Sequence, residues 1–140
     1  MSFKDSFATD QVELVTYEGG CHCGAVRFRV VVDRHEALAC NCSICRKKGF
    51  LHLIVPKERF TLLTGQDMLS TYTFNTGVAK HTFCRACGIH AFYVPRSHPD
   101  GFDVNVRCLD GDVEGLFHVI PFDGARWEEN IASLFDRPSI

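Results

Sequence analysis

Hydrophobic and polar residues alternate over short stretches along most of this 140-residue chain. In residues 25–32 the alternation would place Val26, Phe28 and Val30 on one face of a strand. Other stretches are rich in β-branched and aromatic residues and are bounded by turn residues, which is typical of short strands. We expect these further strands at residues 51–55, 59–63, 69–74, 79–83, 89–94, 103–109 and 115–120.

The two ends of the chain differ from this pattern. Residues 1–16 lack a clear periodicity and are interpreted as an N-terminal arm, whereas residues 17–135 form the predicted β domain. Near the C-terminus Asp123 can cap a helix, because apolar residues follow it at helical spacing. The predicted fold class is therefore mainly β, with one C-terminal helix. The apolar positions of that helix are Trp127, Ile131, Leu134 and Phe135.

Composition and charge narrow the classes of function. A mass of 15.7 kDa with 46% hydrophobic residues suits one compact domain. The net charge of -2 and a pI near 6.4 argue against duplex nucleic acid or an anionic membrane surface as a partner. The chain start lacks the apolar run of a secretory signal, and no stretch reaches membrane-spanning length. We therefore expect a soluble cytoplasmic protein, where a reducing environment keeps thiols free to bind metal.

Seven of the eight cysteines lie in three tight clusters. Cysteines only two or three residues apart rarely form a disulfide of good geometry, but they readily share one metal ion. The second cysteine of each flanking pair is followed by glycine, Gly24 or Gly88, which lets the chain turn so that backbone N–H groups approach the sulfurs. The clusters are Cys21 and Cys23 after a predicted turn at residues 18–20, then Cys40, Cys42 and Cys45, and finally Cys84 and Cys87.

These clusters divide most simply into a closed set and an open set. The two glycine-ended pairs together supply four thiolates, which saturate a tetrahedral zinc ion and define a structural site. Cys40, Cys42 and Cys45 then remain as three ligands with one coordination position free, which is the arrangement of a catalytic zinc. The closed set consists of Cys21, Cys23, Cys84 and Cys87.

Two alternatives to this division stay open at the level of sequence. Cys42 and Cys45 could instead join Cys84 and Cys87 in a zinc ribbon, although 38 residues separate the pairs, more than is usual. A histidine could also complete the three-cysteine set as a second structural site. The candidates for that histidine are His52, His81 and His90.

The three cysteine motifs, in this order, resemble the glutathione-dependent formaldehyde-activating enzyme family, which includes the centromere protein V domain. The resemblance covers about residues 17–130. It implies a β-tent fold, also seen in a Rab exchange factor, and two zinc ions per chain with the same closed and open sets. The motifs are Gly20-Cys21-His22-Cys23-Gly24, Cys40-Asn41-Cys42-Ser43-Ile44-Cys45-Arg46 and His81-Thr82-Phe83-Cys84-Arg85-Ala86-Cys87-Gly88.

The activity that the resemblance implies is the reversible joining of formaldehyde and glutathione to S-(hydroxymethyl)glutathione, which is carbon–sulfur lyase chemistry. On this hypothesis the small-molecule partner is glutathione or a related thiol adduct, and Cys42 is a catalytic ligand that leaves the metal transiently. Arg46, Lys47 and Lys48 are candidates to bind the carboxylates of that substrate, with Arg96 and His98 as further candidates. The alternative hypotheses are a non-catalytic, zinc-stabilised protein-binding module and a thiol-based zinc or redox sensor.

Overall fold

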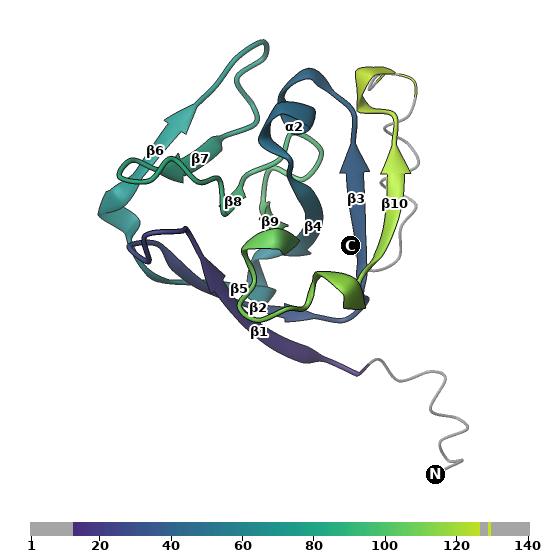
Figure 1. The fold of residues 1–140 in the computed structure, drawn as a ribbon. Coiled ribbons are helices and arrows are strands. Elements are labelled where there is room, and N and C mark those ends of the chain that lie inside the picture. The colour runs from purple at the N-terminus through teal and green to yellow at the C-terminus, as the bar shows by residue number, and fades with distance from the viewer. Residues whose placement is uncertain (1–12, 127–128, 130–140) are drawn as a thin grey trace, which may run out of the picture.

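The structure is a computed structural model that describes residues 13–126 and 129. In these residues the chain forms three β-sheets, one short α-helix and several 3-10 turns, which confirms the mainly β prediction (Figure 1). The helix is α2 (Ser43–Lys48). The strands are β1 (Val15–Gly20), β2 (Arg27–Val32), β3 (Glu36–Cys40), β4 (Leu51–Pro56), β5 (Phe60–Thr64), β6 (Leu69–Tyr72), β7 (His81–Cys84), β8 (Phe92–Tyr93), β9 (Gly101–Asn105) and β10 (His118–Phe122).

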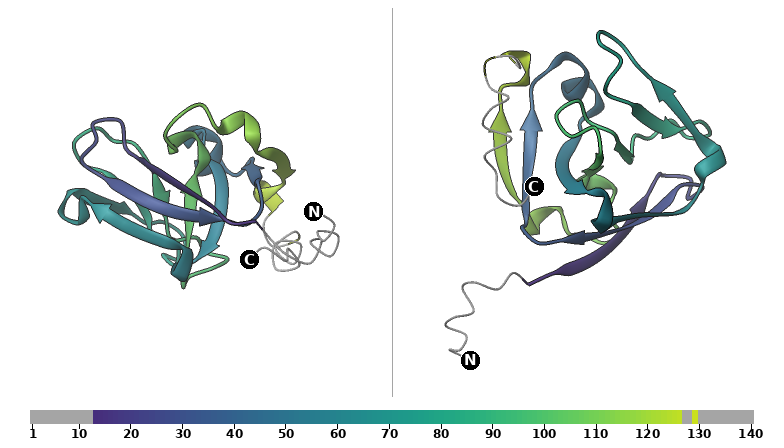
Figure 2. Two further views of the ribbon diagram at one scale, coloured as in Figure 1. Left: turned by 90° about the horizontal axis from the view of Figure 1, so that it is seen from below. Right: turned by 180° about the vertical axis from the view of Figure 1, so that it is seen from behind.

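The largest sheet has the strand order β10-β3-β4-β9-β8, and its neighbours are antiparallel except for the parallel pair β10 and β3. A three-stranded antiparallel sheet, β1-β2-β5, runs along the bottom of Figure 1, and the pair β6–β7 stands on the left. Figure 2 shows the same arrangement from below and from behind. Among the described residues, no helix is long and apolar enough to cross a membrane.

The core lies between the three-stranded sheet and the large sheet. Val26, Phe28 and Val30 are at most 1% exposed, so the predicted apolar face of the second strand is confirmed. The ring of Phe28 stacks on Phe60 at 5.6 Å and meets the edge of Phe92 at 6.1 Å between ring centroids. The stacked pair lies within the three-stranded sheet, and the contact with Phe92 of β8 joins that sheet to the large sheet.

The predicted turn at residues 18–20 is wrong, because these residues end strand β1. Gly19 pairs with Phe28 of β2 and contacts a second backbone segment. A Cβ atom at Gly19 would lie 2.4 Å from the carbonyl oxygen of Cys108. The glycine there thus permits a close approach of two backbones rather than a change of chain direction.

Strand β3 and helix α2 were not predicted. The sequence of β3 is too uniformly apolar to show alternation, and six residues of helix are too few to show a 3.6-residue period. Helix α2 is instead set by its ends, with the Cys42 side chain as the N-cap and Gly49 at φ 66° after its last turn. The stretch predicted at 103–109 divides into β9 and a 3-10 turn, Val106–Cys108, and the strand predicted at 115–120 lies at β10. The predicted C-terminal helix falls outside the described residues apart from its start.

Candidate metal centres

The four cysteines of the closed set come together in space. The sulfurs of Cys21, Cys23, Cys84 and Cys87 all lie within 4.8 Å of one another. Cys21 directly follows β1 and Cys84 ends β7, so two different sheets supply the two pairs. In the described part of the chain, the structure therefore assembles the glycine-ended pairs and not the alternative zinc-ribbon pairing.

Tight turns place backbone N–H groups against these sulfurs. The N–H of Val26 donates to Sγ of Cys21 at 3.3 Å, across a turn in which Gly24 has φ 85°. Backbone N–H groups of Cys87 and Ala86 lower the pKa of Cys84 from its ordinary value of 9.0. Hydrogen bonds of this kind stabilise thiolates, which are the form that binds a metal ion.

The open set also comes together. Cys40 is the last residue of β3, Cys42 is the N-cap of α2 and Cys45 lies inside the helix, with their three sulfurs within 4.8 Å of one another. Among the residues that the structure describes, no histidine or carboxylate joins this group. His52 and His81, two of the histidines considered as a fourth ligand, are buried nearby but lie outside the set.

Negative charge in this set concentrates on Cys42. Hydrogen bonds from the thiols of Cys40 and Cys45, together with backbone N–H groups of Cys45 and Ile44, lower the pKa of Cys42 to about 2. The contact with Cys42 raises the pKa of Cys40, and the contacts with Cys40 and Cys42 raise the pKa of Cys45. Hydrogen bonds within the set thus favour the thiolate form of Cys42 over that of its two neighbours.

The segment after β10 forms one wall of the open set, and the sequence analysis did not identify it. Asn41 ties this segment to the cysteines, because its Nδ2 donates to Asp123 Oδ1 at 3.0 Å and its Oδ1 accepts from the N–H of Ala125 at 2.9 Å. Gly124 lies between these partners, and a Cβ atom there would be 2.1 Å from Sγ of Cys40. No periodicity signals such a contact, since it depends on the pairing of β10 with β3.

A cavity of about 490 Å³ opens beside the three cysteines. Its walls come from all five strands of the large sheet, from helix α2, from β7 and from three loops. The buried polar side chains in it are His52, His81 and Asp103, and Arg96 adds a positive charge. The remaining lining is Leu38, Ser43, Ile44, Ile54, Phe74, Asn75, Ala79, Tyr93, Pro95, Ser97, Phe122, Gly124 and Ala125.

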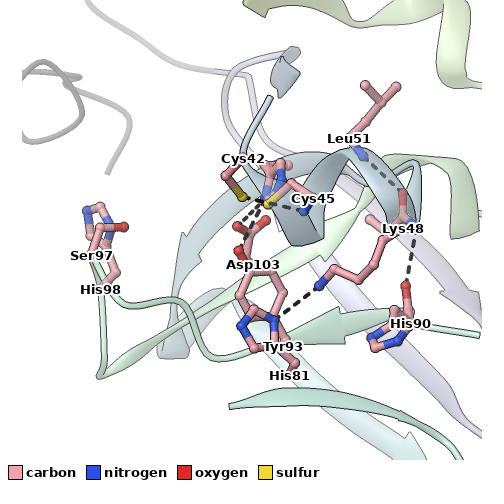
Figure 3. A network of polar contacts seen from close by, with 12 residues as sticks. Cys42, Cys45, Lys48, Leu51, His81, His90, Tyr93, Ser97, His98 and Asp103 are labelled. Carbon is pink, nitrogen blue, oxygen red and sulfur yellow. Dashed lines mark hydrogen bonds and ion pairs between the residues drawn. The ribbon is translucent and has the colours of Figure 1, made fainter. Parts of the chain in front are cut away.

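The basic residues after Cys45 take three different positions. Arg46 is exposed and lines neither this cavity nor the second hollow, of about 990 Å³, that Lys47 and Lys48 line. The ammonium group of Lys48 lies 4.0 Å from the ring centre of Tyr93 and 3.3 Å from Nδ1 of His81 (Figure 3). Burial lowers the pKa of Lys48, and burial together with Lys48 lowers the pKa of His81 to about 4.

Fold and site together define a class: a mainly β protein with two sets of cysteines that could each hold a metal ion. The sequence model of the glutathione-dependent formaldehyde-activating enzymes matches residues 16–118. The chain therefore belongs to this family, as its three cysteine motifs predicted.

Two known proteins are similar to this chain. A Halomonas elongata protein is 64% identical over a match that covers 69% of this chain and 67% of that protein, and its name assigns it provisionally to the glutathione-dependent formaldehyde-activating enzymes. The crystal structure of a Rhodobacter sphaeroides protein is similar with a TM-score of 0.68 and 36% identity, covering 75% of this chain and 99% of that one.

Proposed function

We propose that this chain is a zinc-dependent carbon–sulfur lyase that acts on adducts of glutathione-type thiols. The specific reaction is the reversible formation of S-(hydroxymethyl)glutathione from formaldehyde and glutathione, in accord with the family name. The observation that supports it most is the convergence of three thiols, with no fourth side-chain ligand in the described residues, on a cavity of about 490 Å³. Small-molecule sites typically have volumes of about 300–1,000 Å³.

The donor atoms fit two zinc ions per chain. All eight cysteines are free of disulfides, and thiolate sulfur is a donor that zinc prefers. Four thiolates suit a closed structural site, while three leave one position for a ligand. A zinc ion in the open set would lower the pKa of a bound thiol and stabilise it as a thiolate. Because free thiols are required, we also propose a reducing, cytoplasmic location.

Within the open set, we assign the catalytic role to Cys42. Its sulfur belongs to a half-buried side chain, whereas Cys45 is held inside α2 and is only 5% exposed. Cys42 also stands at the N-cap, where its sulfur accepts a hydrogen bond of 3.4 Å from the N–H of Cys45. Cys42 is thus more accessible than Cys45 to a thiol adduct that binds or leaves.

The carboxylates of the substrate require cationic partners. Arg96 lines the cavity itself, and we propose it as the first of these partners. Arg46 and Lys47 remain proposals for a carboxylate that extends beyond the cavity, since both are exposed on α2. Lys48 has a weaker case, because its ammonium group already packs on two aromatic rings and on His81.

The proposal is tested by measuring exchange between formaldehyde, glutathione and their adduct by two-dimensional exchange NMR. We expect the zinc-loaded protein to accelerate this exchange above its spontaneous rate. Cys42→Ser should reduce the acceleration about 100-fold or more while the closed set keeps its ion. Cys108→Ser is the matched control, since Cys108 belongs to neither set and should leave the rate unchanged.

Two results would contradict the lyase proposal. One is an unaccelerated exchange with fully zinc-loaded protein. The other is an X-ray absorption spectrum in which both zinc ions have four protein ligands and do not change when glutathione is added. The second result would instead support the non-catalytic protein-binding module.

A further inference from the structure

A buried polar group lines the same cavity as the open cysteine set and has no part in the two cysteine sets. His52 comes from the central strand β4, and Asp103 from its neighbour β9. The register pairs Ile54 with Asp103, so His52 and Asp103 are diagonal neighbours on one face of the sheet. Tyr93 of β8 pairs with Asp103 and adds a third polar side chain to that face.

The imidazole of His52 is held in one orientation. Its Nδ1 lies 2.6 Å from Oδ2 of Asp103, so Nδ1–H donates to the carboxylate. The hydroxyl of Tyr93 lies 3.4 Å from the same nitrogen. His52 is 5% exposed and Asp103 is 1% exposed, so little solvent competes for this hydrogen bond. A carboxylate on Nδ1 presents Nε2 as the reactive nitrogen of the ring.

That second nitrogen has no partner among the residues that the structure describes. Within this part of the chain, Nε2 of His52 is buried without a hydrogen bond, and so is Oδ1 of Asp103. Buried polar atoms in folded proteins are nearly always paired, so an unpaired one on a residue that lines a cavity is a candidate to bind a ligand or a water molecule there. His52 and Asp103 border the same cavity as Cys40, Cys42 and Cys45.

His81, the other buried histidine of this cavity, is engaged differently. Its Nδ1 contacts the ammonium group of Lys48 at 3.3 Å, and its ring stacks between Phe74 and Tyr93. A histidine next to a cation is poorly suited to accept a proton. The structure therefore distinguishes His52 from its neighbour.

We propose that His52, oriented by Asp103, is the acid–base catalyst that exchanges a proton with the oxygen of the thiol adduct. This role rests on the proposed lyase function. The ligand class that Nε2 would bind is the hydroxyl group of a hemithioacetal, or the carbonyl oxygen from which that group forms. Asp103 is a positioning residue, because it acts on the substrate only through the imidazole.

In the joining direction, His52 Nε2 takes the proton of the thiol. The sulfur electron pair forms the carbon–sulfur bond, and the π electrons of the carbonyl move to its oxygen. That oxygen then receives from Nε2 the proton that came from the thiol. In the reverse direction, Nε2 removes the hydroxyl proton, the carbonyl re-forms, the carbon–sulfur bond breaks, and the departing sulfur regains the proton. His52 ends each cycle as it began, and no oxidant or reductant is needed.

The experiment compares His52→Gln, Asp103→Asn and the control His118→Gln, whose side chain is exposed on β10. Zinc content and exchange kinetics are measured for each zinc-loaded variant. We expect His52→Gln to lower kcat about 100-fold or more, the usual contribution of acid–base catalysis, with KM and zinc content little changed. Asp103→Asn should lower kcat less, and His118→Gln should leave it unchanged.

A second measurement needs no variant. In the parent protein with ¹⁵N-labelled histidine, the Nε2 resonance of His52 should shift when glutathione and formaldehyde are added together, and the His118 resonances should not. If the parent is active and His52→Gln keeps its full kcat, the role of His52 is refuted while the lyase function stands. The same conclusion follows if the parent is active and the Nε2 resonance of His52 does not shift when glutathione and formaldehyde are added. A parent that accelerates nothing overturns the lyase function and this role with it.

Discussion

Replacing Gly124 by alanine tests whether the segment after β10, residues 123–125, shapes the open cysteine set as one of its walls. The new Cβ atom would lie 2.1 Å from Sγ of Cys40 and 3.3 Å from Cβ of Cys42. Non-bonded heavy atoms are most stable at about 3.5 Å or more, so the sulfur or the wall must move by about 1.4 Å. The wall cannot move freely, because the neighbouring N–H of Ala125 donates to Asn41 at 2.9 Å.

A displacement of that size exceeds what a zinc site tolerates, because metal–ligand distances in proteins vary by only about 0.2 Å. Overpacking of this kind typically costs about 1–3 kcal/mol. We expect Gly124→Ala to weaken zinc binding at the open set by about 10–100-fold, which corresponds to about 1.4–2.7 kcal/mol. The closed set, which contains no part of this wall, should retain its ion.

The assay is the number of zinc ions per chain after equilibration with a graded series of chelator concentrations. Gly115→Ala is the matched control, since a Cβ at Gly115 meets no heavy atom of the described residues within 4 Å. Two zinc ions with parental affinities in Gly124→Ala would refute the inference that this glycine is required for the geometry of Cys40.

Three smaller changes probe the same region. Asn41→Ala removes two hydrogen bonds between Asn41 and the segment after β10, and it should lower the free energy of unfolding in urea by about 1–2 kcal/mol. An unchanged urea midpoint would contradict a stabilising role of these hydrogen bonds. Protonation of His81 is suppressed in the folded protein, with a pKa lowered from 6.5 to about 4 by burial and by Lys48. Below pH 6.5 the unfolded chain binds a proton at His81 that the folded protein does not, so the free energy of unfolding of the parent relative to His81→Phe should fall between pH 6.5 and 4. A difference in unfolding free energy between the two proteins that stays constant over this range, measured by chemical unfolding, would contradict this prediction. Because Lys48 packs on Tyr93, Lys48→Met should lower the melting temperature and leave the KM for the thiol adduct unchanged. A raised KM would instead indicate that Lys48 contacts the substrate.

Close spacing made the cysteines predictable from sequence. Two thiols one or two residues apart stay near each other in almost any fold, so local chemistry alone indicated the pairs and the triplet. The division of the seven clustered cysteines into sets of four and three followed from the assumption that the two pairs with a glycine-ended turn bind the same ion. The alternating face of β2 was equally local, since Phe28 and Val30 follow a period of two.

The rest of the site depends on contacts between strands far apart in sequence. Asp103 lies in a stretch read as an ordinary strand, and its role appears only when β9 pairs with β4 and brings it to His52. Gly124 has no local signal at all, because its neighbour Cys40 lies on a strand that it meets through β10. A histidine in the otherwise apolar strand β4 was the one available hint, since a buried imidazole needs a partner.

The parallel pairing of β3 with β10 has a consequence for biosynthesis. Translation completes the closed set when it adds Cys87. It completes the wall of the open set only when it adds Gly124 and Ala125. At roughly 5–20 residues per second, the ribosome needs about two to seven seconds to add the intervening segment. The four sulfurs of the closed set are therefore complete before this wall is made, and the cavity beside Cys40, Cys42 and Cys45 is finished among the last features of the described fold.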